Sequence, residues 1–328
     1  MKIIADDKIP FITDFFSAHE VVLLPGESIT HTHLESATIL LTRTVTTVNE
    51  ALLKNTPIKW VGTVTTGTDH IDTPWLSENN ITLATAAGAN SSAVAEYVMS
   101  CVAALMKSNL LSTQNVTAGI IGCGRIGKIV ARSLQKLGCS ILCYDPFLTE
   151  KLDFNFVSSL TEIFQQSQLI SIHTPLTKTG LFPTFRMINK KLLSKLKYNT
   201  ILINTARGAV VDQHDLLKIN HLMLCWDVWE NEPAISLPLL SRVFIGTPHI
   251  AGYTQTAKYR ATQMIYEQAA AYFGWKPIDS IQTITPTVCA NYDLLIYTKQ
   301  FRNAFQCCDT EEKIKNTFIH ERKIYPWR

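Results

Sequence analysis

Three segments of the sequence place a chemically capable residue shortly after a run of apolar residues. Arg207 lies in "LINTARGAVVD", Glu232 in "LCWDVWENEP" and His249 in "TPHIAGYT". A guanidinium can grip a carboxylate through two hydrogen bonds, and an imidazole exchanges protons near neutral pH. A carboxylate beside an imidazole favours its protonated form. The three side chains together predict a site that binds an organic acid and moves a proton.

Each of these residues also has a simpler interpretation when it is taken alone. Arg207 is compatible with a surface cation, Glu232 with a loop acid before a proline, and His249 with a packed or exposed loop histidine. For each one singly, the simpler interpretation is at least as strong. The combination favours chemistry, because ligands of open α/β sheets bind beyond the carboxyl ends of the strands, where the three side chains can converge.

A glycine turn precedes these segments. In "GIIGCGRIG", Gly122, Gly124 and Gly127 have G-x-G-x-x-G spacing, directly after an apolar run and at the head of a helix-like stretch. The first glycine permits a tight turn, the second lets the backbone approach a pyrophosphate, and the third lets helix and strand pack closely. Because glycines also mark ordinary turns, the motif alone is weak evidence for a dinucleotide site.

An acidic residue at the end of the next apolar run strengthens that interpretation. Asp145 closes "ILCYD", where a carboxylate can accept hydrogen bonds from both ribose hydroxyls and would repel a 2′-phosphate. We therefore predict NAD rather than NADP. The alternatives are that Asp145 is only a turn residue before Pro146, or that a methyltransferase uses a similar turn and acid.

The elements that must position these residues follow from alternating patterns of β-branched runs and helix-like stretches, which predict parallel sheets. A first set of five strands is expected at "KIIAD", "EVVLL", "ATILLTR", "KWVGTV" and "ITLATA". A second set is expected at "AGII", "SILCYDP", "LISIHTP", "TILINTA", "LMLCWDV" and "VFIGTPHI". Long helices are predicted over residues 90–108 and 256–275. The fold class predicted is thus α/β, with two doubly wound parallel-sheet domains.

Composition narrows the possible partners. The chain has 328 residues, of which 46% are hydrophobic and 17% charged, with a formal net charge of +3, so we expect no nucleic acid partner. No apolar run is long enough to cross a membrane, and "MKIIADDKIP" is too short and too acidic for a signal peptide, which predicts a cytoplasmic protein without a membrane partner.

The eight cysteines are interpreted as small core residues rather than disulfides. No metal is expected, because the following residues lack ligand spacing: His31, His33, Asp69, His70 and Asp72.

The chain resembles the D-isomer-specific 2-hydroxyacid dehydrogenases. The resemblance rests on "GIIGCGRIG", "HTPL", "INTARGAVVD", "DVWENEP" and "HIAGYT", and it covers roughly residues 1–280. It implies NAD-dependent oxidation of a 2-hydroxy acid, and "LTRTVTTVNEALL" and "PIKWVGTVTTGTDHID" resemble members that act on a phosphorylated one. The alternatives are a member acting on 3-phosphoglycerate or glyoxylate, and a non-enzymatic NADH-sensing interaction protein on the same fold.

The resemblance also implies roles for individual residues. His249 is expected to be the acid/base on the C2 hydroxyl, Glu232 to hold it protonatable, and Arg207 to bind the substrate carboxylate and C2 oxygen. The implied cofactor contacts are Gly122, Gly124, Arg125, Ile126, Gly127, Asp145 at the adenosine ribose, Thr174, Asp227 near the nicotinamide, and Gly252. The implied substrate contacts are Thr44, Thr65 and Tyr253, with Arg43 as a candidate for the phosphate.

The domain organisation follows from the same resemblance. Residues 1–93 with 254–280 are expected to form a discontinuous, flavodoxin-like substrate-binding domain, into which a Rossmann-like NAD domain of residues 94–253 is inserted. Residues 281–328 would be a shortened C-terminal dimerisation region, because the tail is shorter than the resemblance leads us to expect. We therefore predict a homodimer whose contacts are altered by this shortening.

Overall fold

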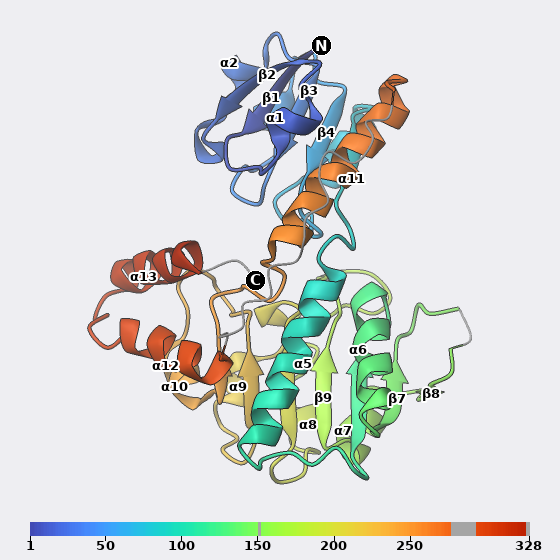
Figure 1. Cartoon of the computed structure of the whole chain (residues 1–328), viewed down its shortest axis with the longest axis vertical. Coiled ribbons are helices and arrows are strands. Elements are labelled where there is room, and N and C mark those ends of the chain that lie inside the picture. Colours follow the sequence, from blue (N-terminus) through green and yellow to red (C-terminus); the bar gives the residue numbers. More distant parts are fainter. Residues whose placement is uncertain (150–151, 277–292, 326–328) are drawn as a thin grey trace. The chain divides into compact units, whose positions relative to one another are not determined.

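The computed structural model describes residues 1–149, 152–276 and 293–325. The chain divides into two compact units, each built around a parallel sheet (Figure 1). The first unit comprises Met1–Asn90 and the chain that returns at Tyr253, and the second comprises Ser91–Gly252 together with the two C-terminal helices. The second unit is therefore inserted into the first, which confirms the predicted fold class.

The first unit contains a five-stranded parallel sheet with the order β2-β1-β3-β4-β5, which is the flavodoxin-like order. Its strands are β1 (Lys2–Asp6), β2 (Glu20–Leu24), β3 (Ile39–Thr42), β4 (Trp60–Thr63) and β5 (Thr82–Thr85). Its helices are α1 (Ile12–Phe15), η1 (Gly26–Ser28), α2 (His31–Leu34), α3 (Glu50–Leu53), α4 (Thr73–Glu78) and α11 (Gln255–Phe273). All five predicted strands of this unit are present.

Helix α11 joins the first unit although it follows the second in sequence. Thr254 caps its start by accepting a hydrogen bond from the Ala257 amide, and Gly274, with φ of 69°, ends it. The helix lies along β4 and β5 (Figure 1), and it buries Ile265 and Tyr266 in the same core cluster as Trp60. Apolar and aromatic side chains of α11 therefore pack this helix on the sheet of the first unit.

The second unit contains a seven-stranded parallel sheet with the order β12-β11-β10-β9-β6-β7-β8. Its strands are β6 (Thr117–Ile121), β7 (Ser140–Tyr144), β8 (Asn155–Phe156), β9 (Leu169–Ile172), β10 (Ile201–Asn204), β11 (Met223–Trp226) and β12 (Ile245–Gly246). The first strand in sequence lies inside the sheet and the order reverses beside it, as in Rossmann folds. The two-residue edge strand β8 was not expected from the sequence, because so short a segment has no periodicity.

Helices cover the second sheet. They are α5 (Ser91–Lys107), α6 (Arg125–Lys136), α7 (Leu160–Gln166), α8 (Lys190–Leu193), η2 (Gly208–Val210), α9 (Gln213–Leu216), α10 (Leu237–Arg242), α12 (Leu294–Ala304) and α13 (Glu311–Ile324). Helices α5 and α6 lie side by side (Figure 1). The apolar stripe predicted for α5 is confirmed, because Val94, Val98, Val102 and Leu105 are all buried.

The described part of the C-terminal tail packs against its own chain. Three phenylalanines of the tail are buried in the core cluster of the second unit that also contains Trp226 and Trp229. They are Phe301 on α12, Phe305 directly after α12, and Phe318 on α13. Residues 281–292 and 326–328 of the predicted dimerisation region lie outside the described residues. Helices α12 and α13 therefore complete a core rather than extending away from it.

The cysteine prediction is correct only in part. Five free cysteines are buried, as expected: Cys101, Cys123, Cys139, Cys143 and Cys225. The prediction is wrong for Cys307, which is exposed, and for Cys308, which is half-buried, because both follow the end of α12. Cys289 lies outside the described residues.

Among the helices that the structure describes, none is long and apolar enough to cross a membrane.

Candidate active site

The glycine turn between β6 and α6 has the geometry of a phosphate-binding loop. Gly122 has a φ of 88°, a conformation that favours glycine. A Cβ atom at Gly127 would collide with the carbonyl oxygen of Gly122, so this position must stay bare for helix and turn to pack. A Cβ atom at Gly124 would meet no atom within 4 Å. The turn therefore offers open space at the N-terminus of α6, where an anionic group is stabilised.

Asp145 lies against the same turn. One carboxylate oxygen accepts a hydrogen bond from the Cys123 amide at 2.8 Å, and the other accepts one from the Phe147 amide at 3.0 Å. Each oxygen keeps a further lone pair, so the carboxylate can still accept from ribose hydroxyls. The structure thus brings the predicted ribose acid to the edge of the predicted phosphate loop.

Two threonines with buried hydroxyl groups lie just after strands β9 and β10. The side-chain oxygens of Thr174, after β9, and Thr205, after β10, are buried and make no hydrogen bond within the described part of the protein. Since buried polar groups are normally satisfied, these oxygens fit a polar ligand bound at the carboxyl ends of the strands. Together with the bare Gly124, they make the second unit suited to a dinucleotide. Thr205 lies within "INTARG", but nothing in its type or spacing singled it out.

His173, beside Thr174, is held within the second unit, although its buried Nδ1 makes no hydrogen bond within the described part of the protein. Its Nε2 bonds the Ser171 hydroxyl at 2.9 Å, and its amide donates to the Ile121 carbonyl at 2.7 Å. Burial lowers the pKa of His173 to about 3, so the ring is neutral at physiological pH.

His249 and Glu232 form a close pair. The imidazole Nδ1 lies 2.7 Å from one carboxylate oxygen of Glu232, and the other oxygen accepts a hydrogen bond from the Trp229 amide at 2.7 Å. The side chains are 31% and 21% exposed, so the pair is reachable by a ligand. With Nδ1 bound to the carboxylate, Nε2 is the ring atom left to exchange a proton with a substrate.

The electrostatics of this pair keep the carboxylate charged. Burial alone would raise the pKa of Glu232, but the His249 imidazole, the Trp229 amide and the Arg322 guanidinium lower it, and the net shift is downward. Glu232 is therefore ionised at neutral pH and can both orient the ring and stabilise its protonated form.

His249 also has a φ of 57°, an uncommon conformation for a non-glycine residue that the surrounding contacts must hold.

Asp227 organises the loop that carries His249. Its carboxylate accepts hydrogen bonds from the Thr247 hydroxyl at 2.6 Å and from the amides of Ile250 at 2.7 Å and Ala251 at 2.9 Å. Its backbone carbonyl accepts from the His249 amide at 2.7 Å. Burial raises the pKa of Asp227, while the His249 imidazole and these hydrogen bonds oppose the rise. The expected contact of Asp227 with the nicotinamide stays a prediction, since the contacts seen are with the loop.

Arg207 lies at the same edge of the second sheet, shortly after β10, the strand next to the β11 that Asp227 follows. Its Nη1 donates to the Ala206 carbonyl at 2.8 Å, and its own carbonyl accepts from the Asn204 side chain at 3.1 Å. A Cβ atom at Gly208 would collide with the backbone of Trp229, so the Arg207 turn packs directly on the segment that binds Glu232. The turns that carry Arg207, Glu232 and His249 therefore follow three adjacent strands.

The remaining predicted cofactor residues lie at the surface of the second unit. Arg125 is exposed and Ile126 half-buried at the start of α6, beside the glycine turn. Gly252 is half-buried, directly after the loop that Asp227 holds. These positions are compatible with ligand contact, and their roles stay predictions.

The predicted substrate residues belong to the first unit. Thr44 is exposed, beyond β3, and the Thr65 hydroxyl bonds the Thr63 hydroxyl and the Gly67 carbonyl, each at 2.8 Å. The Tyr253 ring has the Lys258 ammonium 3.7 Å from its centroid. Arg43 donates from Nε to the buried Asp6 carboxylate at 2.9 Å, which fixes the direction of its guanidinium.

Two exposed aromatic side chains beside Asp145 were missed by sequence reasoning. Phe147 is 69% exposed and Phe182 is 42% exposed, and their ring centroids are 5.5 Å apart. No periodicity marks them, because they lie in two loops that only the fold brings together. They form an apolar surface next to the predicted ribose acid.

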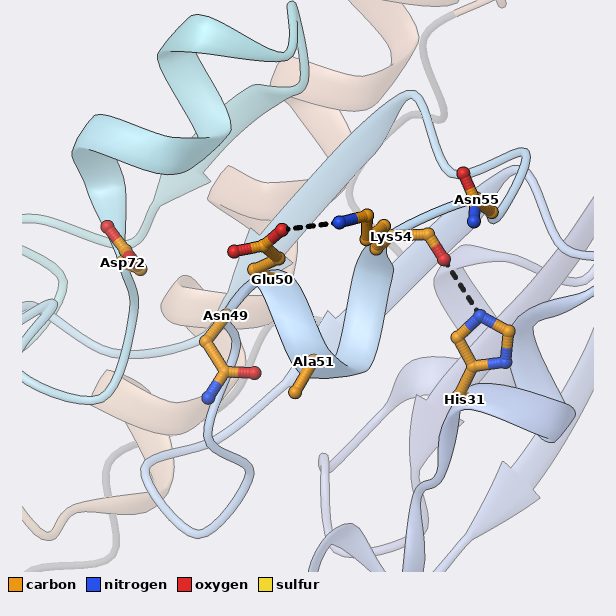
Figure 2. Close-up of a pocket in the computed structure, with 7 residues that line it drawn as sticks. All are labelled: His31, Asn49, Glu50, Ala51, Lys54, Asn55 and Asp72. Atoms are coloured by element: carbon orange, nitrogen blue, oxygen red, sulfur yellow. Dashed lines mark hydrogen bonds and ion pairs between the residues drawn. The ribbon is translucent and has the colours of Figure 1, made fainter.

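A surface hollow of about 680 Å³ lies elsewhere on the first unit, and Figure 2 shows its lining. It is lined by His31, Asn49, Glu50, Ala51, Lys54, Asn55 and Asp72, none of which is a predicted site residue. Its polar groups are engaged locally: His31 Nε2 bonds the Lys54 carbonyl at 2.8 Å, and Lys54 Nζ pairs with Glu50 at 2.9 Å (Figure 2). Size alone therefore does not make this hollow a site.

One further group has ligand atoms close together. Asp212, His214 and Asp215 are near enough to approach one cation, which their sequence spacing had not indicated. Asp212 accepts a hydrogen bond from the Asp215 amide, and Asp215 accepts one from the Lys190 amide. Both carboxylates thus serve helix starts, so the cluster supplies no argument for a metal site.

Comparison with known proteins identifies the family. Residues 89–251 match the model of the D-isomer specific 2-hydroxyacid dehydrogenase NAD binding domain. An erythronate-4-phosphate dehydrogenase of Coxiella burnetii (strain RSA 331 / Henzerling II) is 46% identical over 274 residues, covering 83% of this chain and 75% of that protein. One of Acinetobacter baumannii (strain SDF) is 39% identical, covering 100% of this chain and 97% of the relative.

The chain belongs to the D-isomer-specific 2-hydroxyacid dehydrogenase family. Its fold agrees, because the NAD⁺-bound 3-phosphoglycerate dehydrogenase of Entamoeba histolytica superposes with a TM-score of 0.72 at 26% identity, covering 84% of this chain and 95% of the other. This dehydrogenase is thus an oxidoreductase with NAD as its cofactor, as the sequence predicted. The relatives named above also confirm the resemblance to members with a phosphorylated substrate.

The glycine turn generates a first prediction. Gly124→Ala should change the free energy of unfolding by no more than about 0.5 kcal/mol, because the added methyl group meets open space. It should weaken NADH binding by about tenfold or more, because the methyl group occupies the approach to the turn. Fluorescence titration with NADH and thermal unfolding measure the two effects.

Gly127→Ala is the matched control. It should lower the melting temperature, since its methyl group collides with the Gly122 carbonyl. An unchanged NADH affinity in Gly124→Ala would show that the turn does not face the cofactor.

The Glu232–His249 pair generates a prediction for stability against pH. The folded pKa of Glu232 is lowered from its usual 4.5, so its charge stabilises the folded state above that value, and this contribution is lost as pH falls through the folded pKa. The stability difference between wild type and Glu232→Gln should therefore shrink on acidification to below about pH 4. Urea unfolding at several pH values measures it, with Glu267→Gln, an exposed position on α11, as control. A difference independent of pH would contradict an ionised Glu232.

Proposed function

We propose that the protein oxidises 4-phospho-D-erythronate to (R)-3-hydroxy-2-oxo-4-phosphooxybutanoate with NAD, in pyridoxal 5′-phosphate biosynthesis. The observation that carries this proposal is the 2.7 Å contact between His249 and Glu232 at the strand ends of an NAD-binding unit. The choice of substrate is supported by relatives of 39% to 46% identity that are named erythronate-4-phosphate dehydrogenase.

The roles of the chain's own residues follow from this geometry. Nε2 of His249 takes the proton of the C2 hydroxyl, and the Glu232 carboxylate at Nδ1 stabilises the imidazolium that forms. Arg207 holds the substrate carboxylate and stabilises the oxygen as it becomes a carbonyl. When bound, NAD supplies the acceptor for the hydride that leaves C2. Asp227 keeps the His249 loop in place throughout.

The cofactor would be held by the second unit. The residues proposed for this role are Gly122, Gly124, Arg125, Ile126, Gly127, Asp145, Thr174 and Gly252. The unsatisfied Thr174 hydroxyl and the open face of Gly124 support this assignment. Asp227 would serve the nicotinamide end through the loop that it anchors.

The substrate would be recognised by Thr44, Thr65 and Tyr253 of the first unit, with Arg43 as the candidate for its phosphate. The 2.9 Å ion pair with Asp6 supports Arg43 as a pre-oriented cation. A guanidinium so held loses less freedom on binding an anion.

Replacing the proposed acid/base provides the test. With 4-phospho-D-erythronate and NAD, the wild type should produce NADH, and His249→Gln should lower kcat by about 10²–10⁴-fold while NADH still binds. His214→Gln, at a side chain that is 80% exposed, is the matched control and should keep full activity.

The assay also separates the alternatives. Higher kcat/KM with 3-phosphoglycerate or glyoxylate would reassign the substrate. Tight NADH binding without turnover of any 2-hydroxy acid would favour a sensing protein and contradict the proposal.

We further propose a cytoplasmic homodimer. Ile296 of α12 and Ile319 and Ile324 of α13 are 60%, 53% and 55% exposed, and exposed apolar residues grouped on two packed helices support a protein interface. Sedimentation analysis of the wild type and of Ile319→Asp tests this. Two monomeric species would reject the homodimer, whereas a dimeric wild type and a monomeric variant would support it.

A further inference from the structure

The two C-terminal helices contact the strand that leads to His249. The hydroxyl of Thr298 on α12 accepts a hydrogen bond from the amide of Gly246, the last residue of β12, at 3.1 Å. Thr298 is only 2% exposed, so this bond is made in a nearly dry environment, where it is hard to replace with water. Helix α12 thereby fixes the end of the strand from which the His249 loop departs.

A tryptophan links the same helix to both partners of the proposed acid/base pair. The Trp229 ring centroid lies 6.3 Å from that of Phe301 on α12, and both side chains are buried. The Trp229 indole donates to the Thr247 carbonyl at 2.9 Å, while its backbone amide donates to Glu232 at 2.7 Å. A shift of α12 would therefore disturb the Glu232 side and the His249 side together.

Helix α12 is itself held at both ends. Asp293, at its start, pairs with Lys107 of α5 at 3.2 Å. Near its end, Arg302 donates to the Leu240 carbonyl at 3.2 Å and also contacts the Val243 carbonyl. Leu240 and Val243 lie at the end of α10, directly before β12. The helix is thus held by α5 at its start and, near its end, by the segment directly before β12.

Helix α13 adds charge to this arrangement. It packs on α12 through the Tyr297 and Tyr325 rings, whose centroids are 5.3 Å apart, and the Tyr297 hydroxyl donates to the Glu321 carbonyl at 3.4 Å. Arg322, on the same turn, is one of the groups that lower the pKa of Glu232. The pKa of Tyr297 is raised by burial, and to a lesser extent by Glu321, Tyr325 and Asp227. Both acids of the candidate site therefore lie within the electrostatic reach of the tail.

We propose that α12, packed on α13, is a positioning element for the Glu232–His249 pair: Thr298 fixes the end of β12, and Phe301 packs on the Trp229 whose amide binds Glu232. This inference rests on the roles proposed above for Glu232 and His249. Both helices lie outside residues 89–251, the segment that matches the family's NAD-binding domain. The pair thus depends on a part of the chain that the family model does not include.

The physical reason is that acid/base chemistry tolerates little displacement. A misplacement of about 1 Å by a distant change can cost about a hundredfold in rate. The groups that lower the pKa of Glu232 are the His249 imidazole, the Trp229 amide and the Arg322 guanidinium, and His249 also lowers the pKa of Asp227. Among these described groups, Arg322 is the cation contributed by the tail.

Thr298→Val tests the hydrogen bond, because valine keeps the shape and removes the hydroxyl. The expected result is a kcat about tenfold lower with unchanged NADH affinity, and recovery of kcat in Thr298→Ser. Lys299→Ala, at the adjacent exposed position, is the matched control and should behave as wild type.

A measurement without substrate separates this proposal from the proposed function. The ring resonances of His249, assigned by NMR with the His249→Gln variant, should shift in Thr298→Val but not in Lys299→Ala. Shifted resonances in a protein that turns over no 4-phospho-D-erythronate would uphold the positioning role and refute only the substrate. Unshifted resonances, with a lower melting temperature as the sole effect, would overturn the proposal.

Discussion

The buried carboxylate of Asp227 is the interaction on which the candidate active site depends. It accepts hydrogen bonds from the Thr247 hydroxyl and from two consecutive amides, those of Ile250 and Ala251. These bonds fold the chain around His249 and hold it at a φ of 57°. A buried carboxylate is costly unless several donors satisfy it, and here the same donors define the loop. The hydrogen bonds that offset the cost of burying the Asp227 charge are therefore the same bonds that shape the His249 loop.

A second feature of the site is that several of its supporting hydrogen bonds are donated by backbone amides. Asp227 binds loop amides, Trp229 offers its amide to Glu232, and Thr298 binds the Gly246 amide. Backbone groups have fixed positions relative to the sheet, so they transmit its geometry to the site. Nε2 of His249 and the guanidinium of Arg207 then remain at the partly exposed edge, where a ligand can be met.

The tail illustrates how one segment can have two physical roles. Phe301, Phe305 and Phe318 bury their rings in the core of the second unit, which stabilises that unit. Other side chains of α12 and α13, including Ile296 and Ile319, remain exposed. The same two helices therefore stabilise a core with one face and present apolar side chains to the surface with another.

Much of the fold was already determined by local patterns. Apolar runs of β-branched residues fixed eleven strands in advance, and the stripe of Val94, Val98, Val102 and Leu105 predicted α5, because periodicity and burial are local properties of the chain. The glycine spacing and Asp145 predicted a dinucleotide-binding turn for the same reason. The types and motifs around Arg207, Glu232 and His249 were sufficient to identify the family.

Only the tertiary structure decided which groups face one another. The Asp227 contacts, the exposed pair of Phe147 and Phe182, and the bond between Thr298 and Gly246 join residues that lie far apart in sequence. No periodicity marks such pairs, since their meeting depends on strand order and on the path of the loops. The sequence alone thus determined which chemistry the chain carries, and folding in three dimensions determined what holds that chemistry in place.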